Sequence, residues 1–207
     1  MGAACQVRRR CVVMPAASPR SRPSRAQLAA AQHAKLPDLI RPGLRCLFVG
    51  INPGLWSAAS GQHFGNPANR LWPTLHAAGF TPRRFLPSDG EELLELGFGI
   101  TNLVGRATAS AAEVTPAELR AGVPTLQRLV RRYRPAIVAV LAMTAYRVAF
   151  DRPKAMPGEQ DETLAGARVW LLPNPSGLNA SYQLPDLVRL YGQLRVALDA
   201  AGSAGDG

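Results

Sequence analysis

The segment Leu44-Arg45-Cys46-Leu47-Phe48-Val49-Gly50-Ile51-Asn52-Pro53-Gly54 decides the fold class, because an apolar run of strand length passes directly into a turn-forming loop. Three further apolar runs of similar length follow at residues 99–104, 136–141 and 168–172. Runs this short, bounded by turn residues, are typical of strands and too short for ordinary helices. The sequence therefore predicts four short strands.

Helical patterns separate these strands. Three connections offer a candidate N-cap residue: Asn69, Ser88 and Thr115. Thr115 is the best of them, because Pro116 follows it and Glu118 stands three residues on, as in a capping box. Apolar residues at helical spacing predict the core face of a C-terminal helix: Leu184, Leu187, Val188, Tyr191, Leu194 and Leu198. The alternation of elements favours an α/β fold, a three-layer α/β/α sandwich with a short, mostly parallel central sheet.

The 207 residues, 47% of them apolar, suffice for one domain with a sizeable core. We predict a basic flexible arm over residues 1–35, a folded domain over 36–200 and a flexible C-terminus over 201–207. Residues 1–37 carry +7 of the formal charge of +10, so the remainder is only weakly basic. A polyanionic partner such as nucleic acid is thus indicated mainly by the arm. The Arg- and Ser-containing, acid-free start also fits an organellar transit peptide.

The three cysteines, Cys5, Cys11 and Cys46, lack the spacing of a disulfide framework or of a four-cysteine metal or iron–sulfur site. The three histidines are too scattered to suggest a metal site. No apolar run reaches the roughly 18 residues that a membrane helix needs. We therefore expect a cytoplasmic protein in a reducing setting, with no metal, no cofactor and no membrane partner.

The loops that follow the strands are of most interest, because the crevice of an open α/β sheet lies at the carboxyl ends of its strands. They offer neutral amide side chains, Asn52, Asn102 and Asn174, and no carboxylate. The motifs GxGxxG, GxxxxGK[ST], HExxH and GxSxG are absent, which argues against a dinucleotide or phosphate cradle, a zinc hydrolase and a serine hydrolase. Taken alone, the Asn-Pro pairs are also ordinary turn formers.

Four motifs in a fixed order extend this pattern. They are Gly50-Ile51-Asn52-Pro53-Gly54-Leu55, His63-Phe64, Asn66-Pro67-Ala68-Asn69-Arg70 and Leu172-Pro173-Asn174-Pro175-Ser176-Gly177-Leu178. In order and separation they resemble the mismatch-specific uracil/thymine-DNA glycosylase family, within the uracil-DNA glycosylase superfamily. The resemblance runs from about residue 36 to residue 198. It implies a uracil-DNA glycosylase-like fold.

The resemblance also implies a reaction, hydrolysis of the N-glycosidic bond of a mispaired uracil that has been flipped out of double-stranded DNA. Thymine, etheno-cytosine or another damaged base are further substrates of that family. The expected product is an abasic site in base-excision repair. A monomer that works at the bacterial nucleoid within the cytoplasm is expected.

The resemblance assigns a role to each matching residue. Asn52 would be the catalytic residue and hold the water that attacks C1′ of the deoxyribose. Base binding is expected of Ile51, Phe64, Asn102 and Asn174, and a DNA wedge of Gly177 and Leu178. Phe64 would stack on the base, and backbone N–H groups near Ile51 and Phe64 would stabilise the departing anion. Because an amide cannot take a proton from water at neutral pH, turnover should be slow.

One position departs from the family pattern. Ala180 stands where bacterial relatives often carry an Arg that contacts the estranged guanine, which leaves the opposite-base requirement open. The only lysines, Lys35 and Lys154, adjoin no motif, so we expect no Schiff base and a monofunctional enzyme. Two alternatives from other classes remain. One is a non-catalytic DNA-lesion-binding module, and the other is a small-molecule nucleotide-binding α/β protein.

Overall fold

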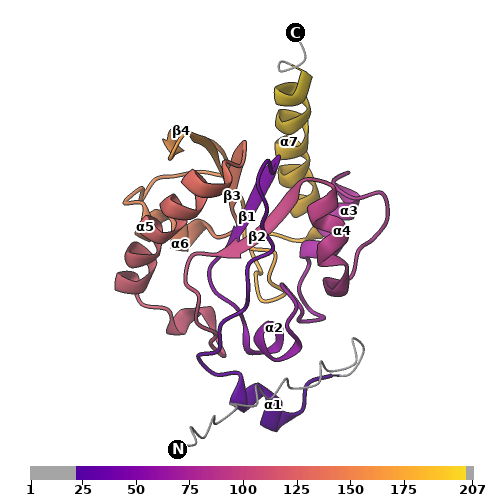
Figure 1. The fold of residues 1–207 in the computed structure, drawn as a ribbon, viewed down its shortest axis with the longest axis vertical. Helices are drawn as coiled ribbons and strands as arrows, with labels where there is room; N and C mark the ends of the chain where they lie inside the picture. The colour runs from indigo at the N-terminus through magenta and orange to yellow at the C-terminus, as the bar shows by residue number, and fades with distance from the viewer. Residues whose placement is uncertain (1–21, 204–207) are drawn as a thin grey trace, which may run out of the picture.

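A computed structural model describes residues 22–203 of the chain, shown in Figure 1. Its strands are β1 (Cys46–Gly50), β2 (Phe98–Asn102), β3 (Ile137–Val140), β4 (Gly158–Leu164) and β5 (Ala167–Leu171). Its α-helices are α1 (Arg25–Ala30), α2 (Leu55–Ser60), α3 (Leu71–Ala77), α4 (Gly90–Glu95), α5 (Pro116–Tyr133), α6 (Met143–Ala149) and α7 (Leu184–Ser203). Two 3-10 turns, η1 (Pro87–Asp89) and η2 (Ala111–Glu113), complete these elements.

The strands form one sheet in the order β2-β1-β3-β5-β4, and every pairing is parallel except that of β4 with β5. Two apolar cores fill its two faces. Phe48 and Ile100 point into the core under α3, α4 and α7, whereas Val49 and Val138 point into the core under α5 and α6. Figure 1 shows these two helix layers on opposite sides of the sheet, with α1 and α2 at one end. The predicted α/β sandwich with a mostly parallel sheet is confirmed.

The sheet has a topological switch point between β1 and β3. The chain leaves β1 toward α3 and α4 on one face, and leaves the neighbouring strand β3 toward α6 on the other. Connections that diverge in this way open a crevice beyond the carboxyl ends of the two strands. The loops after Gly50 and after Val140 therefore face the same hollow.

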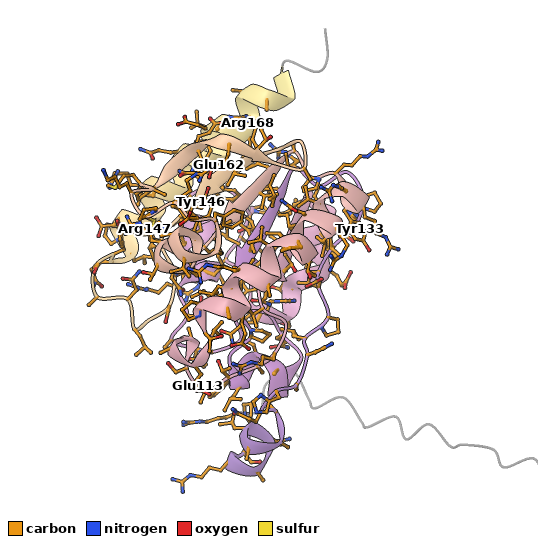
Figure 2. The ribbon with its side chains drawn as sticks, turned by 90° about the vertical axis from the view of Figure 1, so that its left-hand side faces the viewer. Glu113, Tyr133, Tyr146, Arg147, Glu162 and Arg168 are labelled. Carbon is orange, nitrogen blue, oxygen red and sulfur yellow. The ribbon has the colours of Figure 1, made fainter. Side chains whose placement is uncertain are left out.

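Strand β4 was not expected from the sequence. Its residues GEQDETL are polar, and their exposure alternates because the strand lies at the edge of the sheet and only one face is covered. Side chains fix it in place: the Tyr146 hydroxyl donates to Glu162 Oε1 at 2.5 Å (Figure 2), and Arg168 pairs with Glu159 at 2.6 Å. A search for apolar runs misses an edge strand held mainly by backbone pairing and polar contacts.

The helix caps agree with the sequence only in part. Thr115 caps α5 with both halves of the capping box formed, as predicted. Ser88 instead lies inside η1, and α4 begins at Gly90. Asn69 stands one residue before the N-cap of α3, yet its Oδ1 still accepts the Leu71 N–H at 2.9 Å. This late start places Pro73 in the first turn, where its missing N–H costs no intrahelical bond.

Within the predicted arm, residues 24–35 contain a helix and backbone pairs, and residues 1–21 lie outside the described part. Ser24 and Gln27 form the capping box of α1, and the chain then adds backbone pairs to the loop after β2. The His33 N–H donates to Ala107 O, and the backbones of Lys35 and Arg106 form an isolated antiparallel β-bridge. None of the residues of α1 is buried. The sequence showed no apolar periodicity here, and so no helix was expected. A capping box and backbone pairing hold this segment instead.

The first residues of the predicted flexible C-terminus are helical. Helix α7 continues to Ser203, and residues 204–207 lie outside the described part. Its last turns are rich in alanine, which has the highest helix propensity, so glycine 202 does not end the helix. Within residues 22–203, no helix is long and apolar enough to cross a membrane.

Two helical glycines provide a test of this packing. A Cβ at Gly122 of α5 would lie 2.2 Å from the backbone oxygen of Leu103, whereas a Cβ at Gly192 of α7 meets nothing within 4 Å. We expect Gly122→Ala to lower the free energy of unfolding by about 1–3 kcal/mol through overpacking. Gly192→Ala should raise it by roughly 0.5–1 kcal/mol through helix propensity. Urea unfolding of both variants measures the contrast, and equal effects would contradict the close approach of α5 to the loop after β2.

Candidate active site

A cleft of about 670 Å³ lies at the switch point, beyond the carboxyl ends of β1, β2, β3 and β5. Six of the seven predicted site residues line it: Ile51, Asn52, Phe64, Asn102, Asn174 and Leu178. Gly177, the seventh, lies beside it, next to Leu178. The parallel sheet thus brings together residues that are up to 127 positions apart, from Ile51 to Leu178, at one crevice.

Gly50 allows a close approach of two side chains in this cleft. Gly50 and Asn102 are register partners at the ends of β1 and β2. A Cβ at Gly50 would lie 2.6 Å from Asn102 Oδ1 and 3.3 Å from Phe64 Cζ. The Asn102 amide and the Phe64 ring therefore converge over a backbone position that has no side chain. Together they form a polar edge and an aromatic surface at the floor of the cleft.

The amide of Asn52 is held in one orientation. Its Nδ2 lies 2.7 Å from Thr108 Oγ1, 3.0 Å from Arg106 O and 3.1 Å from Pro53 O. The Thr108 hydroxyl donates to Ser110 O, so its oxygen accepts from Asn52. Three acceptors around the NH2 group exclude the flipped amide. The orientation leaves Oδ1 as the amide atom available to a molecule in the cleft.

An ion pair anchors the loop that surrounds Asn52. Arg106 pairs with Glu118 at 2.5 Å, and Glu118 also belongs to the capping box of α5. The hydrogen bonds from Arg106 and from Thr115 lower the pKa of Glu118 to about 2. The carboxylate therefore stays ionised through the neutral and mildly acidic range. The pair fixes the backbone oxygen of Arg106 that faces Asn52.

Hydrogen bonds of two buried side chains anchor the loop that carries Phe64. His63 is buried and donates its Nε2–H to Pro37 O at 2.8 Å, and burial lowers the pKa of its ring, which favours the neutral form. The buried Ser57 hydroxyl accepts the Gly65 N–H at 3.0 Å. Between these two anchors Phe64 has a φ of 50°, in the left-handed region that bulky residues rarely adopt. The two anchors hold this strained turn and so present the ring to the cleft.

Arg70 clamps the loop that holds the predicted wedge. Its Nη2 donates to Ser176 O at 2.5 Å and to Asn179 O at 2.9 Å, while its backbone N–H donates to Pro175 O at 2.8 Å. Gly177 lies so close to the chain before α3 that a Cβ there would be 2.5 Å from Ala68 O. These contacts hold the loop in place on both sides of its tip. At its tip the Leu178 side chain is 94% exposed.

Asn174 has a structural contact within this loop. Its Oδ1 accepts the Ser176 N–H at 2.9 Å, and its backbone oxygen accepts from Asn179 Nδ2 at 2.9 Å. An Asn in such a turn stabilises the loop conformation. Its base contact stays a prediction, and only Nδ2 is left to make it.

The cleft is polar and carries no negative side chain. Six asparagines line it: Asn52, Asn66, Asn69, Asn102, Asn174 and Asn179. No Asp or Glu is among the lining residues. Within residues 22–203, no group of three or more His, Cys, Asp or Glu side chains is placed to hold a metal ion. The arrangement suits hydrogen bonding to a neutral heterocycle and the orientation of water.

Sequence reasoning missed three residues of the site. Thr108 contacts Asn52 directly. Arg70 and Ser57 contact the neighbours of predicted site residues, Ser176 before Gly177 and Gly65 after Phe64. Arg70 belongs to one of the quoted motifs, but the sequence did not indicate that it holds the wedge loop. For Thr108 and Ser57 the sequence offers no local signal, because their hydrogen-bond partners are not sequence neighbours. Asn52 lies 56 positions from Thr108, and Gly65 lies 8 positions from Ser57.

Comparison with known proteins agrees with this geometry. The family model of the uracil DNA glycosylase superfamily matches residues 37–194, which include all of the site residues described above. A solved structure with the same fold is a solution NMR structure of a protein from Methanosarcina acetivorans, described as a candidate uracil DNA glycosylase. It shares 15% identity at a TM-score of 0.50, over 77% of this chain and 98% of that one. On the family match, the chain belongs to the uracil DNA glycosylase superfamily.

Proposed function

We propose that the protein is a mismatch-specific, monofunctional DNA glycosylase that releases uracil from a mispair with guanine in double-stranded DNA. The observation that carries this proposal is the fixed amide of Asn52, whose Oδ1 is left available to the cleft beside Phe64 and Asn102. Membership of the superfamily supports hydrolysis of an N-glycosidic bond in DNA. The choice of mispair is the finer part of the proposal.

In the proposed reaction Asn52 Oδ1 accepts a hydrogen bond from water and holds it against C1′ of the flipped deoxyribose. The C1′–N1 bond breaks, its electron pair leaves with the base, and the water oxygen bonds to C1′. The water then loses a proton to solvent. Since an amide is not a base at neutral pH, Asn52 contributes positioning and little proton transfer. Only a stable leaving group such as the uracil anion departs readily under these conditions.

The departing anion needs hydrogen-bond donors in the cleft. Within residues 22–203, the backbone N–H groups of Ile51 and Phe64 have no protein acceptor, so both are free for a ligand. The Phe64 ring would stack on the base, and the Asn102 amide at the floor would read its polar edge. Fixed donors in a site closed by the base itself stabilise developing charge without reorganisation.

The wedge loop would act in base flipping, the step that precedes cleavage of the glycosidic bond. Leu178 stands exposed on a loop clamped by Arg70, which suits insertion into the space that the flipped base leaves. Ala180 is exposed on the same loop and has no side chain with which to read a guanine. We infer that a preference for mispairs comes mainly from their easier extrusion. Thymine, etheno-cytosine and other damaged bases belong to the same proposal, as do a monomeric state and action at the nucleoid in the cytoplasm.

The first test concerns Asn52 and its support. Asn52→Ala should lower single-turnover uracil release by about a hundredfold or more, while binding of uracil-containing duplex is kept, because only the water's position is lost. Thr108→Val should lower release by roughly tenfold, since it removes the strongest restraint on the amide orientation.

Thr74→Val is the matched control for Thr108→Val. Thr74 is fully buried, and its Oγ1 has no partner within the described residues, so Val should leave release unchanged. Full activity of Asn52→Ala would refute the proposed role of Asn52. Duplex binding without any base release by the wild-type protein would favour the non-catalytic module.

The second test concerns the wedge. Leu178 buries its apolar surface only when the base is extruded, so Leu178→Ala should destabilise that state by roughly 1.5–3 kcal/mol. Uracil release from duplex should slow accordingly, more for A·U than for G·U, because a proper pair resists extrusion more. Release from single-stranded DNA should change little. Equal slowing on single-stranded and duplex substrates would make Leu178 a fold or pocket residue.

A further inference from the structure

A second pocket, here called the tryptophan pocket, lies next to the catalytic cleft. It has a volume of about 740 Å³ and is formed mainly by α2, α3, η1 and the segment between α2 and α3. Asn66 and Asn69 line both the pocket and the cleft, so this segment is the wall between them. Ala68, against which the wedge residue Gly177 packs, also lines the pocket. The tryptophan pocket therefore flanks the wedge.

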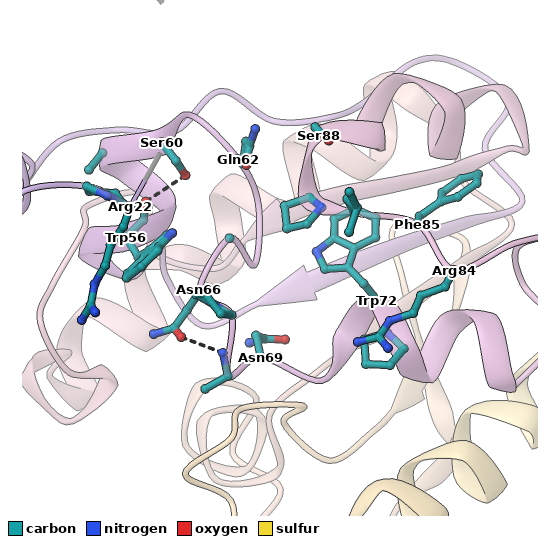
Figure 3. A pocket seen from close by; sticks show the side chains of 18 of the residues that line it. Arg22, Trp56, Ser60, Gln62, Asn66, Asn69, Trp72, Arg84, Phe85 and Ser88 are labelled. Carbon is teal, nitrogen blue, oxygen red and sulfur yellow. Dashed lines mark hydrogen bonds between the residues drawn. The ribbon is translucent and has the colours of Figure 1, made fainter. Parts of the chain in front are cut away.

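Aromatic rings and guanidinium groups line this pocket. Figure 3 shows the rings of Trp56 and Trp72 on opposite sides of it, with Gln62, Asn66 and Asn69 between them. Arg22 lies with its guanidinium carbon 5.6 Å from the centroid of the Trp56 ring, and Arg84 is exposed at the rim beside Trp72.

The charge of the pocket is positive. No Asp or Glu lines it. The salt bridges within residues 22–203 involve neither Arg22 nor Arg84. Two arginines without carboxylate partners at the edge of an aromatic pocket favour an anionic occupant.

A buried donor points to the same pocket. Trp72 is 3% exposed, and its Nε1 has no hydrogen-bond partner within the described residues. In Figure 3 this nitrogen is on the side of the ring that faces Trp56. An unsatisfied buried N–H is costly, and an occupant that carries an acceptor would satisfy it.

We propose that the tryptophan pocket binds a nucleotide, separate from the one in the catalytic cleft. The base lies between Trp56 and Trp72, against the partly exposed Trp56 ring, and presents an acceptor to Trp72 Nε1, while the phosphate lies at Arg84 beside Trp72. Stacking on aromatic side chains is tolerant of base identity, and a pocket of this size is ordinary for a small ligand. The nucleotide comes either from the DNA strand beside the wedge, a source that rests on the proposed function, or from solution.

The test uses deoxyadenosine monophosphate and the full chain, because adenine is not a base that the cleft is proposed to excise. Proton–nitrogen correlation NMR reports each tryptophan, and the Trp72 indole signal is identified by its loss in Trp72→Phe. The nucleotide should shift the Trp72 signal. The Trp170 signal should stay in place, because Trp170 is buried elsewhere and is not among the pocket residues.

A matched pair of arginine variants gives the specificity of this binding. Arg84→Gln should raise the dissociation constant about tenfold or more, as expected for loss of a charge-assisted contact. Arg131→Gln, an exposed arginine on α5 beyond the pocket, should leave it unchanged. The wild type should bind deoxyadenosine, which has no phosphate, more weakly than the monophosphate. Arg84→Gln should bind the two ligands with equal affinity.

A short single-stranded oligodeoxyadenylate distinguishes the two sources. Displacement of the mononucleotide by the oligonucleotide, with the same loss in Arg84→Gln, identifies the DNA strand as the source. Binding of the mononucleotide alone identifies a free nucleotide. An unmoved Trp72 signal, or equal affinity of the wild type and Arg84→Gln, would overturn the proposal. Since no step requires base release, a protein that binds the nucleotide but releases no uracil would refute the proposed function and leave this site standing.

Discussion

Both cores and the catalytic cleft depend on strand β1. Its five residues are all buried, and it pairs on one side with β2 and on the other with β3. Because its side chains alternate between the two faces, β1 contributes to the core under α3, α4 and α7 and to the core under α5 and α6. Its last residue, Gly50, must lack a side chain, since Asn102 and Phe64 converge above it. The same strand therefore fixes the fold and the floor of the site.

The chemistry proposed for this cleft relies on fixed geometry and not on a strong base. The Asn52 amide is neutral, and three acceptors hold it in one orientation. No carboxylate lines the cleft, so nothing in it repels the anionic base that leaves. Such a catalyst is slow, but slowness is compatible with selectivity. Under the proposed mechanism, a cleft that only orients water would act on bases that leave easily and would spare normal cytosine, which leaves poorly.

Two arginines tie the functional loops to the folded body. Arg106 joins the loop around Asn52 to the start of α5, and Arg70 joins the wedge loop to the start of α3. The Arg106 pair is partly exposed to solvent, and pairs of that kind add little to stability. Their effect is on position. The Arg70 guanidinium holds two backbone oxygens of the wedge loop, and the Arg106–Glu118 pair fixes the residue whose backbone oxygen accepts from Asn52. The exposed Leu178 at the tip of the wedge loop is thereby joined to a loop whose ends are held in place.

Local information in the sequence was enough for the four core strands, the capped start of α5, the neutral character of the crevice and the motifs that carry the family resemblance. These follow from apolar runs and from turn and cap chemistry, which act over a few residues. The polar edge strand β4 and the folded segment before residue 36 escaped, because backbone pairing with distant chain and polar contacts hold them.

Only the tertiary structure decided how the site residues are held. Thr108 meets Asn52 across 56 positions and Arg70 meets Ser176 across 106, distances over which no periodicity or spacing rule operates. Likewise, the left-handed backbone of Phe64 is imposed by its anchors and not by its own preference, which is against that conformation. The sequence by itself indicated that Ile51, Asn52 and Asn102 reach the crevice, because strand ends place them there. Their orientation is a property of the packed loops, since each amide, ring and hydroxyl is held by partners that only the completed fold brings within hydrogen-bond distance.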